Sequence, residues 1–155
     1  MGSGFRELEI WKLGMEICED TYRITNQFPK HEIYTLVSQM RRSAISVPSN
    51  IAEGFARRNK GEKYQFINIS GASNAELETQ LELSHRLGYI DDSSYSQLLE
   101  KIEKEGKMIN GYVKLSCHLS ILLSYRKDCH GLPTYRRAQN DPADGARFCA
   151  EGTCA

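Results

Sequence analysis

The sequence has no run of eighteen or more apolar residues, which excludes a transmembrane helix of ordinary length. Its first residues, MGSGFRELEIW, also lack the basic segment followed by an apolar segment that is typical of a secretory signal. Neither sign of charge is in excess, since 20 Lys and Arg balance 20 Asp and Glu for a formal net charge of +0. A neutral chain has no overall attraction to nucleic acid or to an anionic membrane, so such binding needs a local cluster of charge. We therefore expect a cytoplasmic protein that makes no contact with a membrane.

Patterns that bind metals or phosphate are also scarce. The five cysteines have irregular spacing and include no C-x-x-C pair, so we expect reduced thiols, no zinc site and no other cofactor. Glu82 and His85 form an E-x-x-H pattern, but a di-iron site in a helical bundle requires a second such pattern, which the helical part lacks. No glycine-rich loop ends in G-K-S or G-K-T, and no nucleophile lies in a strand-turn-helix elbow. These features argue against an enzyme.

What the sequence does have is helical periodicity, and its 155 residues are enough for one domain with a buried core. A first helix is predicted from an apolar stripe with steps of three and four residues, and it ends before Pro29. A second helix is predicted from about His31 to Arg58. The stripes are Leu8, Trp11, Met15, Cys18 and Tyr22 in the first helix, and Met40, Ala44, Val47 and Ile51 in the second.

Capping residues place two further helices. Asn59, with a glutamate three residues later, resembles a capping box and predicts a third helix from about Lys60 to Gly88. Residues 91–94 offer caps for a fourth helix, which continues to about residue 123. Four helices joined by short loops predict an all-α fold, namely an up-and-down antiparallel four-helix bundle over residues 5–123. Residues 1–4 are predicted to be a linker, and residues 124–155, which have few branched aliphatic side chains, a disordered tail.

The second predicted helix carries a row of polar side chains beside its apolar stripe. The members of this polar row recur at steps of three and four residues: Gln39, Ser43, Ser46, Asn50, Glu53 and Arg57. A solvated helix face more often carries lysine and glutamate, whereas most of these side chains are small or form hydrogen bonds. We expect Gln39, Asn50 and Glu53 to be largely buried, either between helices or between subunits, and to serve assembly instead of catalysis.

Basic residues are concentrated in the same helix and in the turn that follows it. The group consists of Arg41, Arg42, Arg57, Arg58, Lys60 and Lys63. Acidic residues are concentrated later in the chain, so the zero net charge hides an asymmetry of sign. One hypothesis is that the basic group binds the phosphates of RNA or DNA. The patch on each subunit is modest, but its repetition in an oligomer would make one multivalent binding site. The other is that Arg57 pairs with Glu53 and the remaining cations only keep the surface soluble.

Three segments resemble a known family: FRELEIWK, FPKHEIYTLVSQMRRSAISVPSNIAEGFARR and SGASNAELETQLELSHRLGYI. They are similar to the bacterial four-helix-bundle proteins encoded in 23S rRNA intervening sequences, over about Phe5 to Leu119. The resemblance implies a four-helix bundle that assembles as a ring-like homopentamer. It also implies kinship with accessory proteins of diversity-generating retroelements, which bind nucleic acid and a reverse transcriptase. The segment after Ser124 and the neutral net charge depart from the pattern of these relatives.

These features predict a non-enzymatic, homo-oligomeric scaffold, pentameric by the resemblance, that binds RNA or DNA through the six basic residues. The alternative is an adaptor that binds another protein and no nucleic acid, similar to the reverse-transcriptase accessory proteins. A metal-dependent enzyme is the third hypothesis, and it depends on the single E-x-x-H pattern.

Overall fold

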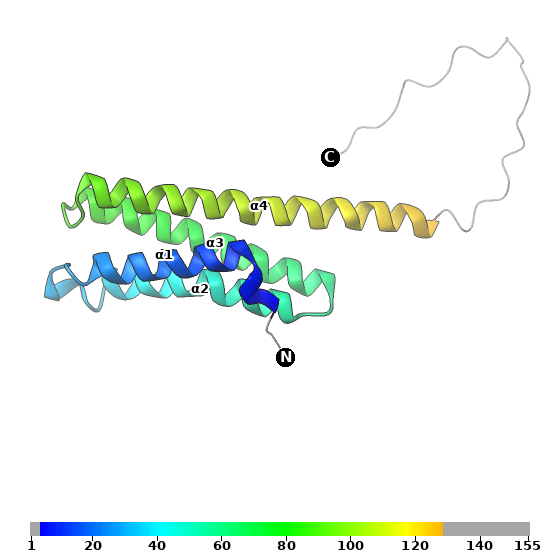
Figure 1. Cartoon of the computed structure of the whole chain (residues 1–155), viewed down its shortest axis with the longest axis horizontal. Coiled ribbons are helices and arrows are strands. Elements are labelled where there is room, and N and C mark those ends of the chain that lie inside the picture. The colour runs from blue at the N-terminus through cyan, green and yellow to red at the C-terminus, as the bar shows by residue number, and fades with distance from the viewer. Residues whose placement is uncertain (1–3, 129–155) are drawn as a thin grey trace, which may run out of the picture.

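The computed structural model describes residues 4–128, with side chains described over residues 4–114. Its elements are η1 (Gly4–Glu7), α1 (Glu9–Thr25), η2 (Lys30–Glu32), α2 (Leu36–Ala56), α3 (Lys60–Arg86) and α4 (Asp92–Asp128). Figure 1 labels the four α-helices. The described residues form helices and no strands, which confirms the predicted all-α class. Of the segments predicted to lie outside the bundle, residues 1–3 and 129–155 fall outside the described residues, and α4 extends to Asp128.

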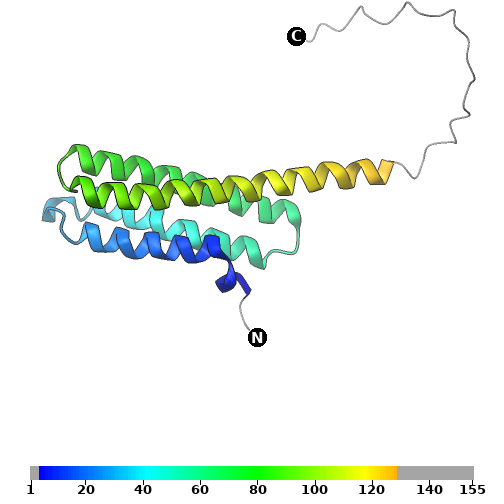
Figure 2. The ribbon, with the colours of Figure 1, turned by 45° about the horizontal axis from the view of Figure 1, so that its top comes forward.

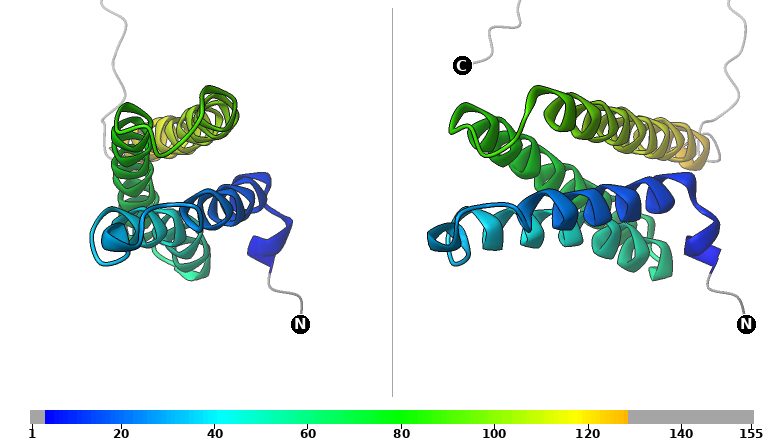
Figure 3. Two further views of the ribbon diagram at one scale, coloured as in Figure 1. Left: turned by 90° about the vertical axis from the view of Figure 1, so that its left-hand side faces the viewer. Right: turned by 60° about the vertical axis from the view of Figure 1, so that its left-hand side comes forward.

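The four α-helices run alternately up and down, each beside its neighbours in the chain, and α1 closes the bundle against α4 (Figure 3). The contact between α2 and α3 is the most extensive. The 37 residues of α4 correspond to about 55 Å of helix, and Figure 2 shows α4 running past the ends of the other three. Within the described part of the chain, no helix combines the length and the apolarity that a membrane span requires.

The buried face of α1 differs from the predicted stripe. The side chains that enter the core include Ile10, Leu13 and Ile17, each at most 8% exposed. Of the predicted stripe only Cys18 is buried; Leu8 and Trp11 are half-buried, and Met15 and Tyr22 are exposed. The prediction is wrong because α1 carries two apolar stripes with the same period, and periodicity alone does not decide which one faces the core. An apolar strip therefore remains on the outer surface of α1.

The apolar stripe of α2 is confirmed, since Met40, Ala44, Val47 and Ile51 are each at most 1% exposed. The start of the helix differs from the prediction. Residues 30–32 form a single 3-10 turn, and the α-helix begins only at Leu36, because the backbone of the preceding residue lies outside the helical region, with φ −114° and ψ −106°.

The capping residues predicted for the last two helices are confirmed, but the capping box at Asn59 is not, since no hydrogen bond among the described residues joins Glu62 to Asn59. The side chain of Asn59 accepts a hydrogen bond from the backbone N–H two residues later at 2.8 Å, at the start of α3. Gly88 has a φ of 73°, a conformation that glycine adopts without strain, and it follows the end of α3. Asp91 Oδ1 accepts hydrogen bonds from the N–H groups of Ser93 and Ser94, at 3.0 and 2.9 Å, at the start of α4.

The core consists of two clusters of buried side chains. The larger cluster includes Phe28 and Ile90, so it extends to the end of the bundle where α1 connects to α2 and α3 connects to α4. The smaller cluster joins Ile10, Val47, Ile51 and Ile109. On α4 the two clusters are separated by the residues between Ile102 and Ile109, where Glu105 is buried.

Candidate nucleic-acid interface

The six basic residues form two separate groups. Arg41 and Arg42, here called the 41–42 pair, lie in the first half of α2. The other four lie after the end of α2 and in the first turn of α3; this turn group consists of Arg57, Arg58, Lys60 and Lys63. The sixteen residues from Arg41 to Arg57 correspond to about 24 Å of helix. A ligand that touches both groups of one chain must therefore be extended.

Arg41 is held in place by the end of α1. Its Nε donates a hydrogen bond to Thr25 Oγ1 and its Nη2 donates one to Asn26 Oδ1, both at 2.9 Å. The guanidinium carbon lies 4.6 Å from the centre of the Tyr22 ring, a cation–π contact. Arg42, by contrast, is exposed and forms no ion pair with any described residue. The two neighbours therefore have different roles, since Arg41 ties α2 to α1 and Arg42 leaves its charge free.

The turn group is divided in the same way. Arg57 Nη2 lies 3.9 Å from Glu53 Oε2, and its guanidinium carbon is 4.9 Å from the centre of the Phe66 ring. Both Arg57 and Glu53 are exposed, so this pair contributes little to stability. Arg58 and Lys60 are exposed and form no ion pair with a described residue. Lys63 Nζ lies 5.4 Å from the centre of the Phe55 ring, a cation–π contact. Arg58 and Lys60 are therefore the free cations of the turn group.

Among the described residues, the polar row forms hydrogen bonds with α3 only through its middle members. Ser43 is buried, and its hydroxyl lies 2.8 Å from Gln80 Oε1, to which it can donate. Ser46 Oγ lies 2.8 Å from Ser73 Oγ, and the Asn50 amide donates to the Ser46 carbonyl at 2.7 Å. These contacts place part of the row at the boundary between α2 and α3.

The prediction that Gln39, Asn50 and Glu53 are largely buried is wrong within the single chain, where Gln39 and Glu53 are exposed and Asn50 is half-buried. Helical geometry gives the reason. At about 100° per residue, Ser43 lies about 70° from the centre of the apolar stripe of α2, Gln39 about 110° and Glu53 about 150°. The polar row therefore lies along the edge of the surface that α2 buries against its neighbouring helices, and not inside that surface. Its burial between subunits remains a prediction.

Glu105 on α4 is a buried carboxyl that the sequence pattern did not single out. Its side chain is 0% exposed, and neither carboxyl oxygen has a hydrogen-bond partner among the described residues. Burial raises the pKa of the Glu105 carboxyl to about 8, because the charged form loses its hydration. The sequence does contain a pattern that indicates this burial. Leu98, Ile102 and Ile109 are buried, and position 105 continues their steps of four and three residues.

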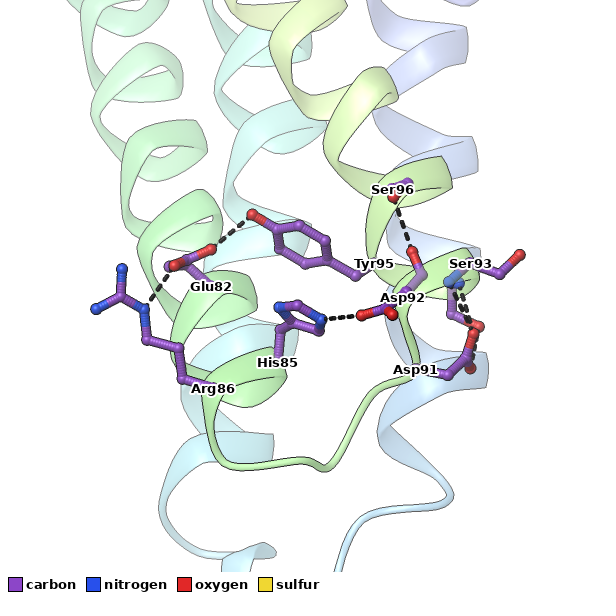
Figure 4. A network of polar contacts seen from close by, with 9 residues as sticks. Glu82, His85, Arg86, Asp91, Asp92, Ser93, Tyr95 and Ser96 are labelled. Atoms are coloured by element: carbon purple, nitrogen blue, oxygen red, sulfur yellow. Dashed lines mark hydrogen bonds and ion pairs between the residues drawn. The ribbon is translucent and has the colours of Figure 1, made fainter.

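The two residues of the E-x-x-H pattern, Glu82 and His85, lie at the end of α3 and contact side chains at the start of α4 (Figure 4). Glu82 accepts hydrogen bonds from the Tyr95 hydroxyl and from Arg86 Nε, both at 2.6 Å, and these two donors lower the pKa of the Glu82 carboxyl. His85 Nε2 lies 2.7 Å from Asp92 Oδ1, and its ring stacks on Tyr95 with 4.2 Å between centroids. The carboxylate and the imidazole of the pattern thus both have local partners. Among the described residues, no three His, Cys, Asp or Glu side chains come together as a metal site would need.

The outer apolar strip continues from α1 onto α2. A hollow of about 600 Å³ lies between these helices, and its lining includes Trp11, Met15, Ile45 and Pro48. Met15 and Ile45 are 37% and 45% exposed, although such side chains are usually covered. We call this surface the α1–α2 apolar face. It is suited to contact with another protein surface.

Residues 6–111, about two thirds of the chain, match the family described as 23S rRNA-intervening sequence protein. No curated protein matches the chain. A similar solved structure is the 1.70 Å crystal structure of a protein with unknown function from the S23 ribosomal protein family of Bacteroides thetaiotaomicron. The two are 20% identical, the match covers 68% of this chain and 98% of that chain, and the TM-score is 0.64. At this identity the likeness is evidence for the fold alone.

Proposed function

The chain belongs to the 23S rRNA-intervening sequence protein family, and on this basis we propose that it is a non-enzymatic, homo-oligomeric scaffold that binds RNA or DNA. The binding residues are the basic ones of α2 and of the turn between α2 and α3. The observation that carries this proposal is that Arg42, Arg58 and Lys60 are exposed and form no ion pair with any described residue. A cation that is already paired must give up its partner to bind phosphate, whereas these three are free to do so.

Self-association is supported by the α1–α2 apolar face. A continuous apolar surface in contact with water is unfavourable, and a second copy of the chain would cover it. We propose a homopentameric ring in the cytoplasm, in which each subunit contributes one 41–42 pair and one turn group. Repetition around a ring turns weak single contacts into strong binding, because the later contacts form within one complex.

The nucleic-acid contact is tested by removing the three free cations together, as Arg42→Ala, Arg58→Ala and Lys60→Ala in one variant. Its matched control is Lys104→Ala, Lys107→Ala and Lys114→Ala, which changes the net charge equally at exposed positions of α4. Fluorescence anisotropy with a labelled RNA is recorded between about 50 and 200 mM salt, the range over which phosphate contacts weaken most visibly. We expect the first variant to bind more weakly and with a smaller dependence on salt, because each lost phosphate contact reduces the salt slope by about 0.7–0.9. Equal affinity of the first variant and the wild type would remove the nucleic-acid part of the proposal.

The assembly is tested separately with Met15→Glu and Ile45→Glu in one variant. A charge at each position opposes burial of the α1–α2 apolar face but leaves the core untouched, since both side chains are exposed in the single chain. Sedimentation velocity should show the wild type as an oligomer and the variant as a smaller species with an unchanged helical circular-dichroism spectrum. A wild-type protein that sediments as a monomer would contradict the proposed assembly.

The second candidate is an adaptor that binds another protein and no nucleic acid. It is favoured by the same α1–α2 apolar face, whose lining side chains include only one that carries a charge, Glu19. The two candidates predict different results. An adaptor would not respond to the loss of Arg42, Arg58 and Lys60, but would lose its partner when Met15 and Ile45 are replaced by glutamate.

A further inference from the structure

The connection between α1 and α2 lies at the left of Figure 1. A second hollow lies at this end of the bundle. Its volume is about 900 Å³, and it is lined by the last turns of α1, by residues of the connection and by the first half of α2. Three cationic side chains line it, Lys30, Arg41 and Arg42, and no acidic side chain does. The hollow therefore presents one sign of charge on a chain whose net charge is zero.

Two of the three cations are free to bind a ligand. Lys30 and Arg42 are exposed, and neither forms an ion pair with a described residue. Arg41 is fixed by Thr25, Asn26 and Tyr22, so it contributes a positive charge at a constant position. Such a set of charges favours the binding of an anion. Because Lys30 lies in η2 and the two arginines lie in α2, the hollow suits an anion that carries more than one charged group.

The wall of the hollow also carries an aromatic side chain with no aromatic packing partner. Tyr34 is 91% exposed, the highest value among the described large hydrophobic side chains, and its ring contacts no other described aromatic ring. Tyr22, on α1, already has the Arg41 guanidinium over its ring. The free face of Tyr34 is therefore the one available for stacking with a ligand.

We propose that this hollow binds a short single-stranded segment of RNA or DNA, with one base stacked on Tyr34 and neighbouring phosphates at Lys30 and Arg42. Aromatic side chains that stack on bases, combined with a positively charged groove, are the usual means of binding single strands. A duplex does not offer such a base, because its bases are stacked on one another. The proposal rests on the proposed nucleic-acid contact and specifies where and in which form the nucleic acid binds.

The test uses fluorescence anisotropy at about 50 mM salt, where phosphate contacts are strong, with three labelled probes: a short oligouridine, the corresponding oligothymidine and an RNA duplex of the same length. The variants are Tyr34→Ala, Tyr34→Phe and Arg42→Ala in the full chain. Tyr34→Ala should weaken binding of the single strands about 5-fold or more, since one stacked base contributes that much or more. Tyr34→Phe keeps an aromatic ring and should bind within about 2-fold of the wild type. Duplex binding should not change in either Tyr34 variant, which also shows that the fold is intact.

Two controls separate this site from the general proposal. Arg58→Ala with Lys60→Ala removes the free cations of the turn group, at the far end of α2, and leaves the hollow intact. If that variant weakens single-strand binding while Tyr34→Ala and Arg42→Ala do not, the nucleic-acid contact stands and the site in the hollow is overturned. If no variant changes the binding, both proposals are overturned. A short polyglutamate that competes equally with wild type and Tyr34→Ala would show a general anion site and would also overturn base stacking.

Discussion

Gly14 on α1 lies directly against Glu105 on α4: a Cβ atom at position 14 would come within 2.7 Å of Glu105 Oε1. The same Cβ atom would lie 3.4 Å from Pro48 Cβ, so α2 closes the space from another side. Glycine at position 14 is thus what leaves room for a carboxyl inside the bundle. Three helices meet there, between the two clusters of the core.

Gly14→Ala should destabilise the protein. Overpacking a buried site costs about 1–3 kcal/mol, whereas replacing glycine by alanine inside a helix contributes about 1 kcal/mol in favour of folding. We therefore expect a net loss of about 1 kcal/mol in the free energy of unfolding, measured by urea denaturation. Gly111→Ala on α4 is the matched control, and it should stabilise the protein. Among the described residues, no atom apart from the neighbouring backbone of α4 lies within 4 Å of its added Cβ. Stabilisation by both substitutions would show that the Glu105 carboxyl moves aside freely.

Stability should fall as the pH rises from about 5 to about 8. The unfolded Glu105 carboxyl ionises near the ordinary glutamate pKa of 4.5, whereas the folded one stays protonated until its pKa of about 8. The unfolded state therefore binds fewer protons across this window, and the free energy of unfolding decreases, by about 3 kcal/mol at pH 7 relative to acid. The carboxyls whose pKa is lowered, such as those of Glu32 and Glu82, titrate below this window, and the Cys18 thiol, with a pKa of about 12, titrates above it.

Glu105→Gln isolates this effect, because an amide of the same shape does not titrate. Melting temperatures measured across the same pH window should decline for the wild type and change much less for the variant. At the alkaline end of the window the variant should be the more stable of the two. A wild-type melting temperature that stays level over this range would mean that the carboxyl finds a partner in the folded protein.

Arg41→Lys should destabilise the protein although it preserves the charge. A lysine has no planar fork to reach Thr25 and Asn26 together, and it stacks less well on Tyr22. We expect a loss of about 1–2 kcal/mol, the scale of one to two hydrogen bonds, from chemical denaturation. Arg42→Ala is the neighbouring control and should change stability by less than about 0.5 kcal/mol, because its side chain is exposed and makes no ion pair with a described residue. Equal effects of the two substitutions would argue against the anchoring role of Arg41.

Asn50→Leu should change assembly or stability. The Asn50 amide donates to both the carbonyl and the hydroxyl oxygen of Ser46, and that hydroxyl also meets Ser73 on α3. Leucine removes these donors from a half-buried position. Ala56→Leu, at an exposed position of the same helix, serves as the control for an added apolar side chain. An unchanged sedimentation profile together with an unchanged melting temperature would show that the polar row serves neither assembly nor stability.

The fold was predictable from sequence where a pattern had one interpretation. The apolar stripe of α2 and the caps at Asn59, Gly88 and Asp91 each point to one arrangement, and the structure has them. The face of α1 was not predictable, because two apolar stripes of equal period compete and only the partner helices decide between them.

The candidate site was predictable in its residue types and less so in its geometry. Six basic residues were identified, but their division into two groups follows from the length of α2, and the anchoring of Arg41 depends on residues of α1 that are distant in sequence. Glu105 was missed for a different reason. Position 105 continues the apolar stripe of α4, but an acidic residue in an amphipathic helix is normally assigned to the solvated face. The opposing Gly14 shows the space that the carboxyl occupies.

The buried Glu105 carboxyl of α4 should affect the heat that is measured when the protein unfolds. At neutral pH each chain takes up close to one proton from the solution as it folds and releases it as it unfolds, since the two states have pKa values on opposite sides of pH 7. The apparent heat of unfolding at pH 7 should therefore depend on the ionisation enthalpy of the buffer, and differ between phosphate and Tris by nearly the full difference between those buffers.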